Sequence, residues 1–501
     1  MKNIGLILLI SLITLTVKAQ NEVDALRYSQ ITFGGTARYM GLGGAFGALG
    51  ADVSSFSTNP AGIALFTKSE ISFTPAINAS NISSKYNETT LTDNKYNFNV
   101  SNIGGVFSYN SYDGEGSGCF GLNFGFGLNR LANFNNNYMM EGLNGNNSIL
   151  SYFVVKANGY APGDLNSFDT KLAYDAYLLE KTDSNSVQYL SAVPNGGVLQ
   201  SKSIATKGAM NELYLTFGGN YKDKLYIGGT FGFPTIRYTE SSSYKEENVT
   251  DTLYTASHPS LYLKDFNINN YLSTTGSGFN FKFGIIYRPI DFIRVGVAVH
   301  TPSLLTLSDK YNTSITSNFY GSKDSVAPYR PDGRTESYTY DSPDGSFNYQ
   351  ITTPFRAIGS LAFIIGKIGL VSADYEFVDY SDAQIESQSE SFSDANNTIN
   401  QIYTSASNIR IGTEWRYDIF ALRAGYALYG SPYKSEINDG KRTSYSAGFG
   451  IRDEDFFIDF AYVYTTGKED YYLYNNENID LKPVKNTFVN QNFLITLGLK
   501  F

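Results

Sequence analysis

The C-terminal stretch of the chain, residues 491–501 (QNFLITLGLKF), alternates between apolar and polar side chains. One set is apolar throughout and consists of Phe493, Ile495, Leu497, Leu499 and Phe501. The other set has Leu494 as its one apolar exception and otherwise consists of Asn492, Thr496, Gly498 and Lys500. Because successive side chains of a β-strand point to opposite faces, the stretch predicts a strand with one apolar face. Such a strand can lie flat against lipid.

The same alternation recurs along most of the chain. Phe281 and Phe283, for example, alternate with Lys282 and Gly284. We predict fourteen such strands, at residues 69–79, 96–109, 119–130, 212–221, 224–239, 277–288, 292–306, 354–365, 367–379, 408–417, 419–429, 443–452, 455–466 and 491–501. An even number of strands allows the sheet to close on itself, which leaves no unpaired edge in lipid.

The predicted connections alternate between short and long from the second strand onward. The short ones lie near residues 221–223, 289–291, 366–367, 417–418 and 453–454. The long polar ones lie near residues 131–211, 240–276, 307–353, 380–407, 430–442 and 467–490. Tight periplasmic turns and long extracellular loops are typical of a transmembrane barrel. We therefore predict an all-β fold, a transmembrane antiparallel β-barrel of about fourteen strands, with an amphipathic helix at 164–181 in the first long loop.

The first nineteen residues are typical of a cleavable signal peptide. Lys2 is the positive residue, residues 4–17 are mostly apolar, and Val17-Lys18-Ala19 forms a cleavage site before Gln20. A retained membrane helix would need about 20 apolar residues, and this run is shorter. No cysteine stands directly after the apolar run, which argues against a lipid-anchored protein.

Composition excludes several classes of function. The single cysteine, Cys119, excludes an intramolecular disulfide and a cysteine-based metal site. The net charge of −9 is spread along the chain, which argues against a nucleic-acid partner. The only histidines are His258, in a polar loop, and His300, on the inward face of a strand. We expect no catalytic residues, no bound metal and no cofactor.

Residues 20–68 do not have the pattern of membrane strands. They are rich in glycine and end in Asn59-Pro60-Ala61-Gly62. Gly41-Leu42-Gly43-Gly44 lacks the spacing of a dinucleotide-binding loop, so we dismiss that function. Small residues allow close backbone packing, which suits a compact segment folded inside a barrel.

Residues 35–46 (GTARYMGLGGAF), Asp52 and Asn59-Pro60-Ala61-Gly62 resemble the N-terminal hatch of the FadL/OmpP1/TodX family of outer-membrane transporters. The resemblance implies a signal peptide at 1–19, a hatch at 20–68 that plugs the lumen, and a barrel at 69–501. It also implies that Asn59, Pro60, Ala61 and Gly62 form the gate. In the family an inward kink of the third strand opens a lateral exit, and here Gly121, Gly125 and Gly127 would tolerate a bend.

Ionisable side chains recur on the predicted inward faces: Lys282, Arg288, Arg294, Asp374, Glu376, Arg410, Glu414, Arg423, Arg452 and Asp459. One interpretation is a polar lumen wall that fixes the hatch through ion pairs. In the other, one or two cations hold a ligand carboxylate by charge-assisted hydrogen bonds. The residues considered for ligand or hatch contacts are Lys282, Arg294, His300, Arg410 and Arg423.

The family resemblance implies passive transport of long-chain fatty acids or related hydrophobic molecules across the bacterial outer membrane. Uptake of an aromatic hydrocarbon or haem-like cargo, and a surface-exposed binding or adhesion barrel, are the alternatives. The expected partners are a hydrophobic small molecule, outer-membrane lipid and lipopolysaccharide. We also expect recognition of the C-terminal Phe501 by the outer-membrane assembly machinery, and a monomer.

Overall fold

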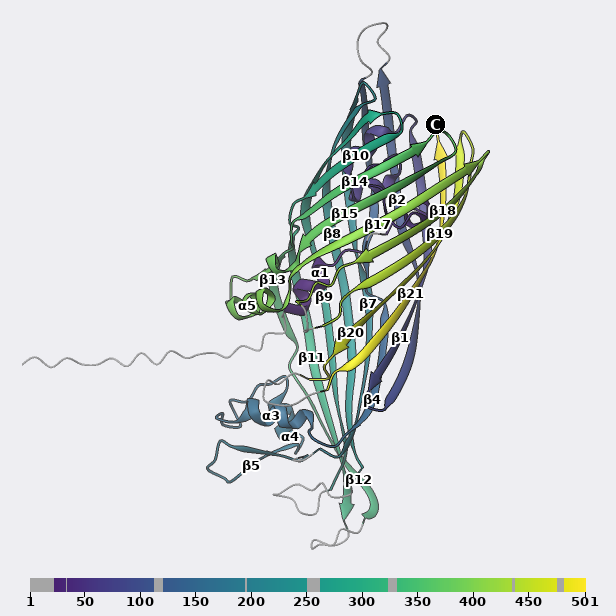
Figure 1. Ribbon diagram of the computed structural model, residues 1–501. Coiled ribbons are helices and arrows are strands. Elements are labelled where there is room, and N and C mark those ends of the chain that lie inside the picture. The colour runs from purple at the N-terminus through teal and green to yellow at the C-terminus, as the bar shows by residue number, and fades with distance from the viewer. Residues whose placement is uncertain are drawn as a thin grey trace, which may run out of the picture.

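The computed structural model describes residues 22–32, 34–111, 120–193, 196–249, 262–322, 331–434, 438–474 and 482–501. Most of these residues belong to the strands of one antiparallel barrel (Figure 1). The predicted signal peptide at 1–19, Cys119 and His258 lie outside the described residues.

Fourteen strands form the wall of the barrel. They are β1 (Glu70–Tyr86), β2 (Thr89–Ser111), β3 (Phe120–Asn133), β7 (Val198–Tyr221), β8 (Leu225–Asn248), β9 (Tyr262–Ile290), β10 (Ile293–His300), β14 (Arg356–Ile365), β15 (Gly369–Asp379), β17 (Ser405–Tyr417), β18 (Phe420–Tyr429), β19 (Arg442–Arg452), β20 (Phe456–Tyr471) and β21 (Val484–Lys500). Each strand pairs with the strands on either side, and β1 pairs with β21 to close the ring. The prediction of a fourteen-stranded antiparallel barrel is confirmed.

Tight turns join the strands at one end of the barrel, which is the upper end in Figure 1. β7 ends at Tyr221 and β8 begins at Leu225, and the turn between them places Asp223 in the left-handed backbone region. Gly366 and Asp418 have the same backbone conformation in two further turns. This conformation suits glycine and aspartate, and it reverses the chain within a few residues. All five predicted short turns are present.

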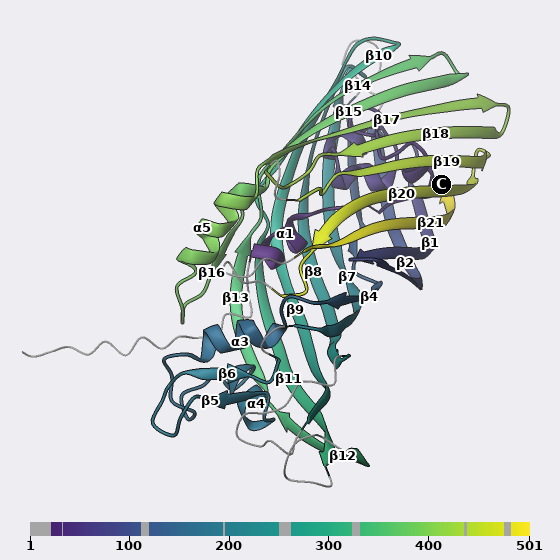
Figure 2. The same cartoon turned by 60° about the horizontal axis from the view of Figure 1, so that its bottom comes forward.

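The strands extend much further toward the opposite end than their alternation predicts (Figure 2). β9 alone has 29 residues, and the predicted loop at 240–276 is largely strand, because β8 continues to Asn248 and β9 begins at Tyr262. Further strands prolong the wall beside β7 and β9: β4 (Asn136–Asn144), β11 (Leu304–Ser322), β12 (Pro331–Asp341), β13 (Gly345–Thr352) and β16 (Gln384–Glu386). The long loops are therefore shorter than predicted.

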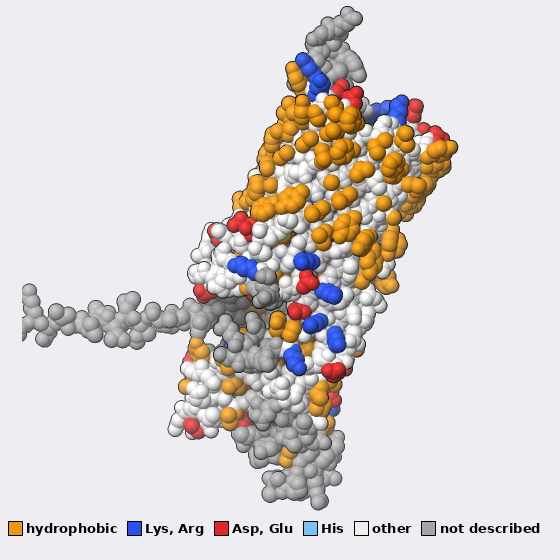
Figure 3. All heavy atoms as spheres, viewed as in Figure 1, with side chains coloured by type: hydrophobic (Ala, Val, Ile, Leu, Met, Phe, Trp, Pro, Cys, Tyr) orange, Lys and Arg blue, Asp and Glu red, His pale blue; other side chains and the backbone are white. Residues whose placement is uncertain are grey.

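The outer face of the barrel bears an apolar band near the tight turns (Figure 3). On β15, Tyr375 and Phe377 point outward and are exposed, whereas Asp374 and Glu376 point inward and are buried. The alternation in the sequence thus separates an apolar exterior from a polar lumen, as in membrane barrels.

Short helices and a small hairpin lie in the long connections between the wall strands. These elements are α3 (Ile149–Ala157), α4 (Thr170–Asp175), β5 (Leu179–Lys181), β6 (Tyr189–Ser191), η3 (Tyr380–Asp382) and α5 (Ser393–Ile402). The predicted helix at 164–181 is wrong in extent, because only Thr170–Asp175 is α-helical, and α3 was not predicted. The buried Glu246 of β8 accepts a 2.9 Å hydrogen bond from the backbone N–H of Ile149 and anchors the start of α3 to the wall. None of the described helices is long and apolar enough to span a membrane.

Candidate functional site

The N-terminal residues 22–32 and 34–66, here called the inner segment, lie inside the barrel (Figures 1 and 2). They form α1 (Glu22–Ser29), α2 (Ala37–Gly41), η1 (Val53–Ser57) and η2 (Pro60–Leu65). α2 contacts strands β18 to β21, and η2 contacts β3, β7, β8 and β9 on the other side of the lumen. The inner segment therefore reaches across the lumen from wall to wall.

Polar side chains cap the N-termini of three of these helices. Thr36 accepts a hydrogen bond from the N–H of Tyr39, and Asp52 accepts one from Ser54. Asn59 accepts one from Ala61, and the following Pro60 takes the first position of η2, where no donor is needed. Each cap satisfies a backbone N–H that is buried away from water, which holds these short helices in a fixed conformation.

The side-chain amide of Asn59 also connects the inner segment to the wall. It donates to the carbonyl oxygens of Gly47, at 2.6 Å, and of Ile285 on β9, at 3.3 Å. A Cβ atom on Gly284 would lie 1.8 Å from the Asn59 Oδ1 atom, so a glycine is required opposite this side chain. The Asn-Pro-Ala-Gly stretch predicted as a gate thus lies at a contact between the inner segment and β9.

Replacing Gly284 with alanine should displace Asn59 and destabilise the folded barrel by about 1–3 kcal/mol through overpacking. Gly359→Ala is the matched control, because a Cβ at Gly359, also in a wall strand, meets no atom within 4 Å. Urea midpoints of the purified proteins measure the difference. Equal midpoints for the two variants would contradict the close contact at Asn59.

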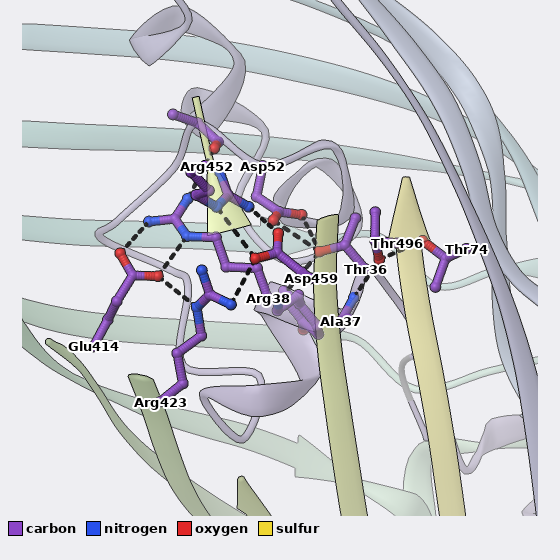
Figure 4. Close-up of polar contacts among 12 residues, drawn as sticks. Thr36, Ala37, Arg38, Asp52, Thr74, Glu414, Arg423, Arg452, Asp459 and Thr496 are labelled. Carbon is purple, nitrogen blue, oxygen red and sulfur yellow. Dashed lines mark hydrogen bonds and ion pairs between the residues drawn. The ribbon is translucent and has the colours of Figure 1, made fainter. Parts of the chain in front are cut away.

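A buried ion-pair network joins α2 to the wall (Figure 4). The Arg38 Nε donates to Glu414 of β17 at 2.9 Å, and Arg423 of β18 donates to the same carboxylate at 2.6 Å. Arg423 continues to Asp459 of β20 at 2.7 Å, and Asp459 also pairs with Arg452. Arg38 of the inner segment is therefore held by an ion-pair network whose other members lie on four strands of the wall.

The remaining inward side chains considered for ligand or hatch contacts have fixed partners as well. Lys282 pairs with Glu212 of β7, and Arg410 pairs with Glu376 of β15 at 2.7 Å. Arg294 donates to the carbonyl of Leu49 at 2.8 Å, and the His300 ring is hydrogen-bonded to the carbonyl of Thr58 at 2.8 Å. Arg294 and His300 thus contact the inner segment, whereas Lys282, Arg410 and Arg423 are bound to wall carboxylates.

A cavity of about 280 Å³, here called the lumen cavity, lies between the inner segment and the far end of the barrel. Its lining mixes apolar side chains, such as Leu26, Met40 and Phe488, with amides, cations and the carboxylate of Glu469. Arg130 of β3 is one of these cations. No carboxylate among the described residues pairs with Arg130, and its Nε atom is buried without a hydrogen-bond partner.

Arg130 reaches the lumen because β3 is irregular there. The pairing of β3 with β7 shifts between Arg130 and Ala132, which marks a β-bulge, and β3 ends at Asn133. The freed carbonyls of Arg130 and Leu131 accept backbone hydrogen bonds from the inner segment, each at 2.8 Å. The break therefore falls later in the strand than the glycines at 121, 125 and 127, which lie within the continuous ladder. Beyond Asn129, the described residues of β3 do not pair with β2.

A second cavity, of about 710 Å³, lies on the opposite side of the inner segment, next to the tight turns. Its lining is rich in cations, including Arg294, Arg416 and Lys500. Arg38, Leu49 and Gly50 of the inner segment line this cavity, whereas Gln30, Thr32 and Gly34 line the lumen cavity. The inner segment separates the two spaces.

These features define a class of protein, a closed fourteen-stranded β-barrel with an apolar outer band and with its own N-terminal segment packed in the lumen. Among solved structures, a Pseudomonas aeruginosa FadL homologue matches with a TM-score of 0.54 and 14% identity, over 94% of this chain and 100% of that one. The chain has the fold of this FadL homologue. The resemblance predicted from residues 35–62 is thus confirmed at the level of the fold.

Two other solved structures are similar over most of their length. The toluene transporter TodX of Pseudomonas putida has 14% identity and a TM-score of 0.48, with 93% of this chain and 99% of that chain covered. The toluene transporter TbuX of Ralstonia pickettii has 14% identity and a TM-score of 0.47, with 93% and 98% covered. In sequence, the model of an uncharacterised protein family, UPF0164, matches residues 11–144, and no curated protein matches the chain.

Proposed function

We propose that the protein lies in the bacterial outer membrane and takes up long-chain fatty acids or related amphiphiles by passive diffusion. The inner segment acts as the hatch, with Asn59 to Gly62 at its gate. The fold, the apolar band on the outer face and the occupied lumen support this proposal.

Arg130 is the observation that favours an amphiphile with a carboxylate over a neutral hydrocarbon. Its guanidinium lines a cavity that also contains apolar side chains, and no described carboxylate neutralises it. A partly buried cation of this kind gains most from a ligand that supplies the missing negative charge. The alkyl chain of the same ligand would lie against the apolar part of the lining.

The path through the protein follows from the two cavities. Cargo enters at the far end of the barrel, where the long loops lie, and reaches the lumen cavity first. A straight path onward would require the inner segment to give up its ion pair with Glu414 and its contacts with β9. Release sideways through the wall needs a smaller movement of the inner segment, so we favour lateral release.

Uptake of labelled oleate by cells that lack the protein, with and without the chain restored, tests the proposed function. We expect faster uptake when the chain is present. We also expect the detergent-purified protein to bind oleate directly. Equal uptake at a verified surface level would overturn the fatty-acid proposal. A neutral aromatic or haem found by mass spectrometry in the purified protein would then identify the cargo, and an empty, impermeable barrel would favour an adhesion role.

A further inference from the structure

The seam at which β1 and β21 close the barrel is interrupted at one point. Phe73 pairs with Leu497 and Ala76 pairs with Leu494, but Thr74 and Pro75 have no ladder partner among the described residues of β21. Proline has no N–H to donate, which explains the missing pairing. The register of β1 with β2 also shifts between Thr74 and Pro75. The wall is thus held by fewer hydrogen bonds here than on either side.

The lumen cavity reaches this interruption from the inside. Ala76 and Leu494, the pair that follows the interruption, both line the cavity, and Met40 of the inner segment lines it beside them. Ala37, Ala461 and Val463 pack with the same pair in a small apolar cluster. This part of the lumen wall therefore presents small or apolar side chains to a ligand in the cavity.

An apolar groove of about 630 Å³ lies on the outer face at the same place. Its lining has no charged residue and includes Pro75, Ile77, Phe98, Ala447, Phe449 and Phe493. Ala76 and Leu494 line this groove as well as the lumen cavity. A single layer of residues thus separates the two spaces.

The inner segment is hydrogen-bonded to the interrupted stretch (Figure 4). The N–H of Ala37, at the start of α2, donates to the Thr496 hydroxyl at 2.6 Å, and Thr496 shares a 2.8 Å hydrogen bond with Thr74. A small movement of α2 would break the first of these bonds and remove support from the seam.

We propose that cargo leaves the lumen through the wall between β1 and β21, beside Pro75, and enters the apolar groove on the outer face. The proposal rests on the proposed function and adds the place of exit. An alkyl chain that moves from the cavity to the groove stays in contact with apolar side chains throughout, and it avoids exposure to water. The alkyl chain of a membrane lipid fits the groove by the same chemistry, so the test has to distinguish the two.

Filling the groove from the outside tests the exit without changing the lumen. Ala447 is an outward, exposed residue of the groove lining, and Ala447→Trp would occupy the space. Ala373→Trp is the matched control, because Ala373 is an outward, exposed alanine on β15. We expect oleate uptake to fall at least about fivefold with Ala447→Trp, for a barrier raised by ~1 kcal/mol, and to stay at the parent rate with Ala373→Trp.

A reversible cross-link tests the seam itself. In a Cys119→Ser background, Ala76→Cys with Leu494→Cys would join the pair that follows Pro75, and Thr235→Cys with Ser277→Cys would join the pair that follows a similar interruption at Pro234 between β8 and β9. We expect oxidation to block uptake with the first pair only, and a reductant to restore it.

Uptake at the parent rate in both Ala447→Trp and the oxidised seam would overturn the proposal, and the groove would then hold membrane lipid only. The proposed function fails separately, if the unmodified chain does not increase oleate uptake at all.

Discussion

Replacing Glu414 with alanine is expected to lower the free energy of unfolding by about 3–5 kcal/mol, the usual cost of leaving a buried ion pair without one partner. Glu414 is fully buried and forms ion pairs with Arg38, Arg416 and Arg423. Its removal leaves Arg38 and Arg423 buried, and among the described residues only Asp459 remains as a carboxylate for Arg423.

The temperature at which the folded band disappears in a heat-modifiability gel measures this loss. Glu414→Gln should fall between the parent and Glu414→Ala, because the amide keeps an acceptor but loses the charge. Lys68→Ala is the control for an exposed pair, and it should change stability by less than about 1 kcal/mol, since Lys68 and Asp455 are both exposed. A Glu414→Ala protein as stable as the parent would show that the network does not hold the fold.

The same substitution has a consequence for permeability. Within the described part of the chain, Arg38 is the one ion-pair link from this network to α2, so its release should loosen the inner segment without removing it. In planar bilayers, Glu414→Ala should therefore show longer or more frequent ion-conducting openings than the parent. Identical conductance would mean that the capped turns and the Asn59 contacts hold the inner segment by themselves.

Replacing Arg130 with alanine should weaken oleate binding by about 2 kcal/mol, roughly thirtyfold in Kd, if the guanidinium holds the ligand carboxylate. Titration calorimetry or displacement of a fluorescent fatty acid from the purified protein measures the change. Arg130→Lys should retain part of the affinity, because the charge is kept but the paired donors are lost.

A neutral ligand of similar size provides the control for Arg130. Binding of a long-chain alkane or alcohol should change little in Arg130→Ala, because it has no carboxylate to pair. Equal losses for oleate and for the alcohol would show that the substitution damages the cavity itself. Unchanged oleate binding would remove the argument for a carboxylate cargo.

The positions of the fourteen strands could be predicted because an apolar outer face and a polar inner face give a period of two. The ends of the strands could not be predicted in the same way. Beyond the apolar band both faces of the wall are polar, as in Ser241–Ser243 of β8 and residues 269–270 of β9. The alternation disappears there although the hydrogen-bonded ladder continues, so the sequence pattern predicts loops where the structure has strands.

The candidate site could be predicted only in part, and the reason is related. The sequence identified Asn59, Arg294 and His300, but the partner of each depends on strand register and on the path of the inner segment. Arg130 could not be predicted because the ladder of β3 becomes irregular at this residue, which the alternation does not show. By simple alternation Arg130 belongs with Leu122, Phe124 and Phe126, which point outward, yet it lines the lumen cavity.

The 29 residues of β9 determine how far from the hydrocarbon core the protein first contacts its cargo. A tilted strand crosses the hydrocarbon core with about 9–11 residues, so most of β9 stands outside it. At about 3.3 Å per residue, the strand measures roughly 90 Å along its length. In the proposed orientation this extension passes through the hydrated sugars of lipopolysaccharide, and a hydrophobic molecule crosses that layer slowly. The extended side of the barrel would then shelter cargo on its way to the lumen, and shortening β7, β8 and β9 together would remove that shelter.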